Sequence, residues 1–235
     1  MRISIIGVGD VEYHFQRLLG MSKEEFTRHI DGIGEVLAQS GIDIVITPDM
    51  GSPLEVAKVF RSKKPRGRVY GLVPKSDLDF GMEHILRYMD AEVDGERVFD
   101  DFIDAGNWYK LDVSKAATGD DVLLLGKSLG SVGEFALGFY IYKLLAKKKP
   151  LVKVERDDIG THIRAGKIIP FTAIIYLPFV KERLDYEIEA YIKKVGGKII
   201  YVRDPDELRK ALDLLKNEYY GISQEKPDLP EGELL

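Results

Sequence analysis

The feature that most constrains the fold is a short apolar segment that passes through a glycine-rich turn into a long apolar segment. Residues 120–125 read D-D-V-L-L-L, which predicts a strand that is buried on both faces. The turn G-K-S-L-G-S-V-G-E follows at 126–134 without a spacer. Residues 135–146 are too long and too apolar for a strand, so we expect a buried helix, and the three lysines at 147–149 suit the negative end of its dipole.

A strand, a glycine turn and a helix in this order commonly form an anion site in α/β proteins. Free backbone N–H groups in the first helical turn can meet phosphate oxygens. Glycines in the turn allow the backbone to approach the bound group closely. We therefore expect a ligand at the carboxyl end of this strand.

Strand-like and helix-like segments alternate along the rest of the chain. Serine N-caps followed by glutamate predict capping boxes at Ser22–Glu25 and Ser52–Glu55, and Asp94-Gly95 predicts a hairpin turn within residues 91–99. The expected strands are 3–6, 42–46, 68–73, 120–125, 151–154, 171–177 and 198–202, and the other expected helices are 22–39, 52–64, 181–194 and 205–216.

This alternation predicts an α/β fold. We expect a single-domain, Rossmann-like three-layer sandwich over residues 1–220, with a mainly parallel sheet of roughly six to eight strands. The segment 74–110 is an elaboration near the carboxyl edge of the sheet. Residues 221–235 contain prolines and acids with little to bury, which predicts a disordered tail.

The composition is that of an ordinary globular protein, and its charge argues against nucleic acid as a partner. The chain has 235 residues, of which 45% are hydrophobic and 31% charged, and its net charge is −5. The N-terminal apolar run at 3–6 is too short for a signal peptide, and no apolar run reaches membrane-spanning length. We expect a cytoplasmic protein that binds neither nucleic acid nor a membrane.

The chain contains no cysteine, which excludes disulfides, thiol catalysis and cysteine metal sites. Absent thiols fit a reducing compartment, and together with many Lys and Glu residues they favour a heat-adapted source. The histidines show no metal-ligand spacing, so we expect no metal and no cofactor. They are His14, His29, His84 and His162.

Two nucleotide-binding motifs can be compared with the turn at 126–134, and neither fits. A Walker A loop ending at Gly126-Lys127-Ser128 needs a glycine at position 121, where Asp121 stands. The spacing of the turn's glycines is not that of G-x-G-x-x-G. The glycines at 7 and 9 lack their third partner, because Glu12 occupies that position.

The residues G-K-S-L-G at 126–130 also match the G-x-S-x-G nucleophile elbow and resemble an α/β-hydrolase. In this interpretation Ser128 is the nucleophile. The fold then needs an acid and a histidine later in the chain. His162 is the only histidine that follows Ser128, and no histidine-glycine oxyanion segment precedes it. A serine hydrolase therefore stays as an alternative.

The order of motifs resembles the Lonely Guy family and the wider group of Rossmann-like nucleotide-binding proteins around it (the SLOG type), once mislabelled lysine decarboxylases. The family's threonine-glycine turn after the second strand is similar to residues 47–54, and its G-x-V-x-G-x-x-P strand to residues 67–74. The hallmark P-G-G-x-G-T-x-x-E falls on residues 126–134, where Gly130, Ser131 and Glu134 match. The family's last helix begins with D-P-x-E, as residues 204–207 do here.

The resemblance implies a nucleoside 5′-monophosphate site with the phosphate at Gly130 and Ser131. In catalytic members the motif glutamate helps to cleave the N-glycosidic bond, so Glu134 would be the catalytic residue of a phosphoribohydrolase. Those members carry an arginine where Leu111 stands, with Lys110 and Lys115 the nearest cations. A non-catalytic nucleotide sensor is therefore the second hypothesis. Glu134 could also serve the helix dipole alone.

The expected site lies where residues 7–10, 47–52 and 126–134 converge at the carboxyl ends of their strands. The family analogy and the apolar helix 135–146 further predict a homodimer. The residues expected to bind the phosphate or the nucleotide are Gly7, Gly9, Thr47, Gly51, Ser52, Gly126, Lys127, Ser128, Gly130 and Ser131.

Overall fold

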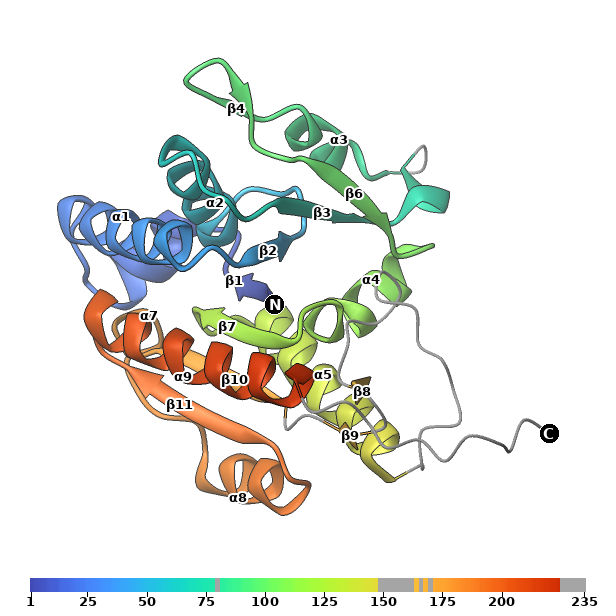
Figure 1. The fold of residues 1–235 in the computed structure, drawn as a ribbon. Helices are drawn as coiled ribbons and strands as arrows, with labels where there is room; N and C mark the ends of the chain where they lie inside the picture. The colour runs from blue at the N-terminus through green and yellow to red at the C-terminus, as the bar shows by residue number, and fades with distance from the viewer. Residues whose placement is uncertain (79–80, 148–162, 165–166, 169–170, 225–235) are drawn as a thin grey trace.

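A seven-stranded sheet forms the middle layer of the fold, and every strand pair in it is parallel (Figure 1). The computed structural model describes residues 1–78, 81–147, 163–164, 167–168 and 171–224. The strand order is β11-β10-β7-β1-β2-β3-β6. The α/β prediction is confirmed, and the number of strands lies within the expected range.

The sheet strands are β1 (Arg2–Gly7), β2 (Asp43–Ile46), β3 (Val69–Val73), β6 (Asp101–Asp104), β7 (Asp121–Leu125), β10 (Thr172–Tyr176) and β11 (Lys198–Val202). Two short antiparallel pairs stand apart from the sheet, β4 (Glu92–Val93) with β5 (Glu96–Arg97) and β8 (Ile163–Arg164) with β9 (Lys167–Ile168). The helical segments are η1 (Glu12–Leu18), α1 (Lys23–Ser40), α2 (Ser52–Ser62), η2 (Lys75–Asp77), α3 (Glu83–Met89), α4 (Trp108–Ser114), η3 (Ala116–Thr118), α5 (Leu129–Lys147), α7 (Leu177–Val180), α8 (Tyr186–Lys194) and α9 (Pro205–Gln224).

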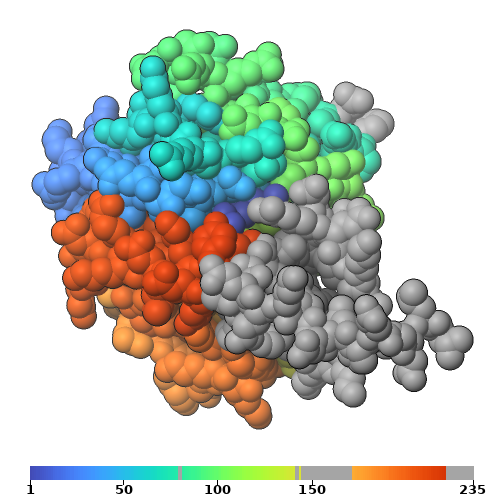
Figure 2. Space-filling view, in the orientation of Figure 1, coloured from blue at the N-terminus to red at the C-terminus, as the bar shows by residue number. Residues whose placement is uncertain are grey.

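Helices cover both faces of the sheet because its strands are apolar on both sides. On one face, helix α1 packs against both α2 and α9, and Figure 2 shows α9 as a band beside α1. Helices α4, α5 and α8 cover the other face. Neighbouring β1 residues serve the two layers, since Ile5 belongs to the core under α1 and Ile6 to the core under α5.

The chain changes direction across the sheet between β6 and β7. Strands β1, β2, β3 and β6 run outward in order, and the chain then returns to place β7 on the other side of β1. The segments that leave β1 and β7 therefore diverge, one leading to α1 and the other to α5. Such a switch point is where open α/β sheets bind ligands.

Several local predictions are confirmed. The Ser22 hydroxyl accepts a hydrogen bond from the Glu25 N–H (3.1 Å) at the start of α1. The hairpin β4–β5 turns at Asp94 and Gly95, whose φ angles are 53° and 77°. The predicted strand at 151–154 and residues 225–235 of the predicted tail lie outside the described residues.

Other predictions need correction. The N-cap of α2 is Gly51, and Ser52 makes no capping hydrogen bond because its hydroxyl bonds to the backbone of Val8, after β1, and of Leu125, in β7. The helix expected at 181–194 begins late, at Tyr186 of α8, and a separate short helix, α7, ends before Lys181. Helix α9 continues to Gln224, past the expected end at 216. The π-helical segment η1, strand β6 and helix α4 were not expected at all.

A buried polar pair ties α1 to the sheet. The Tyr176 hydroxyl, on a fully buried side chain, lies 2.7 Å from Nδ1 of His29. Burial raises the pKa of Tyr176, so the phenol keeps its proton and donates it, and Nδ1 is the acceptor. Burial also lowers the pKa of His29 from its ordinary 6.5, which keeps the imidazole neutral.

This pair predicts an acid-sensitive fold. Because the folded pKa of His29 is below the unfolded value, the unfolded chain binds more protons near pH 6.5, and the free energy of unfolding should fall as the pH drops through that value. Urea unfolding at pH 7.5 and pH 5.5 measures the change. In His29→Leu the loss between the two pH values should be smaller. An unchanged loss would contradict the assignment.

Candidate functional site

One serine hydroxyl joins the start of α2 to the carboxyl ends of β1 and β7, where the expected site lies. Ser52, at the start of α2, is 0% exposed. Its Oγ donates to the Leu125 carbonyl at the end of β7 (2.9 Å) and accepts from the Val8 N–H after β1 (3.2 Å). Its own N–H donates to the Val8 carbonyl (3.0 Å). We call this set of contacts the Ser52 junction.

Three of the expected ligand glycines have a packing role at this junction. A Cβ on Gly7 would lie 2.3 Å from the Ser52 Oγ. Gly51 has a φ angle of +125°, and a Cβ there would lie 2.2 Å from the Val8 carbonyl oxygen. Gly126 has a φ angle of +129°, and a Cβ there would lie 2.7 Å from Cγ1 of Val8. Glycine is thus needed here because the loops touch, whether or not a ligand binds.

Removal of the Ser52 hydroxyl should destabilise the protein. Ser52→Ala leaves the Val8 N–H without its acceptor at a buried position, which should lower the free energy of unfolding by about 2 kcal/mol. Ser62→Ala is the matched control, because the Ser62 hydroxyl donates to Val59 within its own helix (2.7 Å). Urea unfolding measures both variants. Equal losses in the free energy of unfolding would show that the Ser52 hydroxyl stabilises the fold no more than the Ser62 hydroxyl does.

The start of α5 caps itself and leaves two donors open. The Ser131 Oγ accepts from the Ser128 N–H (2.7 Å), and the Ser128 Oγ accepts from the Ser131 N–H (3.1 Å). The backbone N–H groups of Leu129 and Gly130 have no acceptor among the described residues, and Leu129 is 94% exposed. The positive end of a 19-residue helix therefore presents two free N–H groups.

Ser128 is not hydrogen-bonded to a histidine in the part of the chain that the structure describes. Nδ1 of His14 lies 3.0 Å from the Asp10 carbonyl, His29 bonds to Tyr176, and Nε2 of His84 lies 3.9 Å from Asp49. His162 lies outside the described residues. The Ser128 hydroxyl serves as a helix cap, which is not the arrangement of an activated nucleophile.

Glu134 lies in a buried ion pair. Nζ of Lys115 is 3.0 Å from both of its carboxylate oxygens and donates to Oε1, while Oε2 has no hydrogen-bond donor among the described residues. The two side chains are 13% and 10% exposed. Burial raises the pKa of Glu134, and Lys115 opposes that rise. Burial also raises the pKa of nearby Asp112, again opposed by Lys115.

Loss of one partner of this pair should be costly. Lys115→Met leaves a buried carboxylate without its cation, which should lower the free energy of unfolding by about 3 kcal/mol at pH 8. The folded pKa of Glu134 would then lie further above its unfolded 4.5, so the loss should shrink as the pH falls toward 5. Lys115→Met/Glu134→Gln should restore most of the stability at both pH values. A double variant as unstable as the single one would contradict the pairing.

Thr47 and Asp49 follow β2 at the same edge of the sheet. The Thr47 side chain is buried (7% exposed), and its hydroxyl has no hydrogen-bond partner within the described residues. Such an orphaned hydroxyl is uncommon in a folded protein and marks a position where a further polar partner would fit. The Asp49 carboxylate accepts from the N–H of the next residue, Met50 (2.7 Å), so it does not form an Asx turn, whose bond goes to the residue after that.

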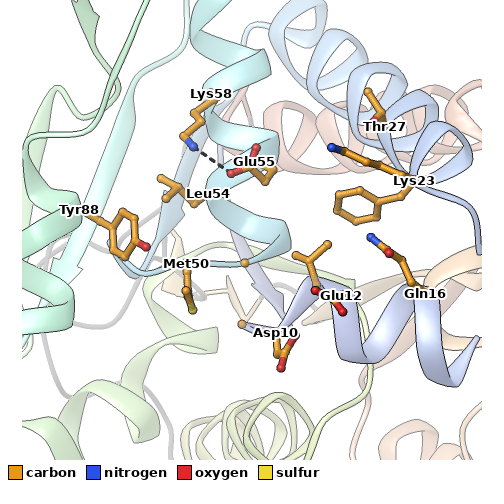
Figure 3. A pocket seen from close by; sticks show the side chains of 14 residues that line it. Asp10, Glu12, Gln16, Lys23, Thr27, Met50, Leu54, Glu55, Lys58 and Tyr88 are labelled. Carbon is orange, nitrogen blue, oxygen red and sulfur yellow. Dashed lines mark hydrogen bonds and ion pairs between the residues drawn. The ribbon is translucent and has the colours of Figure 1, made fainter.

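Two cavities flank η1 at the carboxyl edge. The larger, which we call the α1–α2 cavity, has a volume of about 650 Å³. Its lining includes the apolar side chains of Phe26 and Leu54, of which Figure 3 labels Leu54. An ion pair between Lys58 and Glu55 (2.9 Å) lies on its wall. Its lining residues are Gly9, Asp10, Val11, Glu12, Gln16, Lys23, Phe26, Thr27, Met50, Gly51, Leu54, Glu55, Lys58 and Tyr88.

The smaller cavity, which we call the η1–α7 cavity, has a volume of about 240 Å³. Nζ of Lys127 donates a long hydrogen bond across it to the Glu182 carbonyl (3.5 Å). Its lining residues are His14, Leu18, Leu19, Lys127, Phe179, Val180, Lys181 and Glu182.

The expected site residues thus divide into three groups. Gly7, Ser52 and Gly126 build the junction, together with Gly51, which also lines the α1–α2 cavity beside Gly9. Lys127 lines the η1–α7 cavity, and the start of α5 contains Ser128, Gly130 and Ser131. Neither cavity includes Thr47 or Glu134.

Sequence reasoning missed the residues that η1 contributes to both cavities. The segment 11–21 carries no capping or periodic signal, so nothing indicated a helical element there. The sequence also did not predict the ion pair between Lys115 and Glu134, although Lys115 is one of the two cations nearest the position of the missing arginine.

The structure resembles two solved proteins. One is the molybdenum cofactor binding protein from the phototrophic bacterium Rippkaea orientalis, with a TM-score of 0.52 and 12% identity over 92% of this chain and 96% of that one. The other is the molybdenum cofactor carrier protein MCP from Chlamydomonas reinhardtii, with a TM-score of 0.52 and 16% identity over 92% and 97%. The likeness is one of fold. It supports the expected Rossmann-like domain.

No family model matches the chain, and no curated protein matches it. Among the described residues, no three His, Asp or Glu side chains form a group that could hold a metal ion. In that same part of the chain, no helix is both long and apolar enough to cross a membrane.

Proposed function

We propose that this chain binds a small phosphate-bearing ligand where the loops after β1, β2 and β7 meet. The observation that carries the proposal is the start of α5, where the N–H groups of Leu129 and Gly130 are open at the positive end of the helix. The Lys127 ammonium group belongs to the same turn and adds positive charge. Free N–H groups, a helix dipole and a nearby cation together favour an anion such as phosphate.

The surroundings of this turn suit an organic molecule larger than phosphate. Gly126 packs on Val8, and the next two residues, Gly9 and Asp10, line the α1–α2 cavity. A volume of about 650 Å³ with apolar and polar walls falls within the range of small-molecule sites. The phosphate would lie on α5 and the organic part of the ligand in this cavity.

Two ligand types fit this description. The resemblance to the Lonely Guy family favours a nucleoside 5′-monophosphate such as AMP. The fold shared with two proteins described as binding or carrying the molybdenum cofactor makes that cofactor, which also carries a phosphate, the second candidate. A homodimer belongs to the same proposal, with the exposed Ala136 and Tyr140 of α5 available for a second copy to cover.

Cleavage of the ligand is a second candidate function, and the Lys115–Glu134 pair favours it. The resemblance lacks the family's arginine, but Lys115 supplies a cation to the glutamate at 3.0 Å. Burial raises the pKa of Glu134, and a carboxyl group with a raised pKa can hold a proton for a leaving base. In such a reaction water would add to the ribose as the N-glycosidic bond breaks, and the products would be the free base and ribose 5-phosphate.

The binding site can be tested by a charge placed at the start of α5. Gly130→Asp should reduce the affinity for AMP and for inorganic phosphate about tenfold or more, because the new carboxylate repels the phosphate. A Cβ at this position would meet nothing closer than 3.9 Å, so the fold should tolerate it. The control is Asn217→Asp, which adds the same charge to an exposed position of a different helix, α9. Calorimetry measures all three proteins, and equal affinities would refute the assignment.

A further inference from the structure

The η1–α7 cavity carries more positive than negative charge. The ammonium groups of Lys127 and Lys181 come from the segments that follow β7 and β10, and Glu182 is the acidic residue of the lining. Within the described residues neither lysine forms an ion pair. Two like charges at one small cavity repel each other, and an anion between them would remove that repulsion.

The floor of this cavity strengthens the effect. Phe179 and Val180 lie beneath it and are 2% and 3% exposed. Apolar walls lower the local dielectric, so charges at the cavity interact more strongly than they would in open solvent. A volume of about 240 Å³ is sufficient for a phosphate-sized group.

The backbone holds Lys181 in a conformation that lysine rarely adopts. Its φ and ψ angles are 64° and −47°. Two hydrogen bonds fix this turn, from the Lys181 N–H to the Leu177 carbonyl (2.9 Å) and from the Glu182 N–H to the Val180 carbonyl (2.7 Å). Strain of this kind is often kept at functional sites. Here it ends α7 and leaves Lys181 at the cavity.

Lys127 links this cavity to the start of α5. It precedes Leu129 by two residues, so the two Cα atoms are at most about 8 Å apart. A ligand whose first phosphate lies on the Leu129 and Gly130 N–H groups therefore has a second cationic site within reach. We infer that the η1–α7 cavity binds a second anionic group of the ligand, so that the chain prefers a diphosphate to a monophosphate.

This inference rests on the proposed phosphate site and adds the class of ligand. The probes are AMP and ADP, with inorganic phosphate and pyrophosphate as the pair that lacks the organic part. ADP should bind about tenfold more tightly than AMP, as one additional charge-assisted contact allows. Pyrophosphate should exceed phosphate in the same way.

The variant is Lys181→Ala, and its matched control is Lys194→Ala, which removes an exposed lysine at the end of α8. Calorimetry at low and at physiological salt gives the affinities. In Lys181→Ala the preference for ADP and for pyrophosphate should disappear while AMP binds as in the wild type. The Lys194→Ala protein should keep the preference. Circular dichroism of the variants checks that they fold.

The outcomes separate this inference from the proposed function. If AMP binding depends on Gly130 but ADP and pyrophosphate bind no more tightly, the second anionic site is wrong and the phosphate site stands. If the Lys181→Ala protein keeps the full preference for ADP, the second anionic site is likewise wrong and the phosphate site stands. If none of the four probes binds to the wild type, both ideas fall together. If pyrophosphate binds more tightly than phosphate but ADP binds no more tightly than AMP, the cavity binds only the free anion. That result would refute the inference that the ligand is an organic diphosphate.

Discussion

The hydroxyl group of Ser52 is the contact on which the edge of the sheet depends. It lies at the start of α2 and bonds to Val8, after β1, and to Leu125, at the end of β7. β1 and β7 are parallel neighbours in the sheet, and the segments that follow them lead to opposite faces. Because glycines at 7, 51 and 126 leave no side chain between the loops, the backbone of Val8 lies within reach of both neighbours. The start of α5 and the α1–α2 cavity are held on either side of this one contact.

The sequence was informative where one segment alone decides the structure. The apolar residues 121–125, the capping serine at 22 and the Asp94-Gly95 turn each contain their own signal, and the structure has β7, α1 and the β4–β5 hairpin at those places. Ser52 shows the opposite case. As a serine before proline it predicts a helix cap, but its long-range bonds to Val8 and Leu125 take the hydroxyl instead.

Long-range contacts also explain what could not be predicted of the site. The resemblance implied a catalytic role for Glu134, and nothing in the sequence indicated that Lys115 pairs with it in a buried position. Similarly, η1 has no periodic apolar pattern, and Phe15 contacts Phe26 of the next helix and Phe179 of α7, which lies far away in the sequence. Ion pairs and ring contacts between distant segments leave no local pattern in a sequence.

The position of β1 within the sheet has a consequence for synthesis of the chain. Among the seven strands of the sheet, β1 is made first, and one of its two partners, β7, is made more than a hundred residues later. The Asp120 carboxylate, which accepts a hydrogen bond from the Arg2 N–H (2.7 Å), is made equally late. Until then the nascent chain carries an apolar strand with an unpaired side, which is a hazard for aggregation. Native pairing of this kind also closes a long loop, which slows folding. The N-terminal half is therefore the part of the chain for which we expect chaperones to matter most.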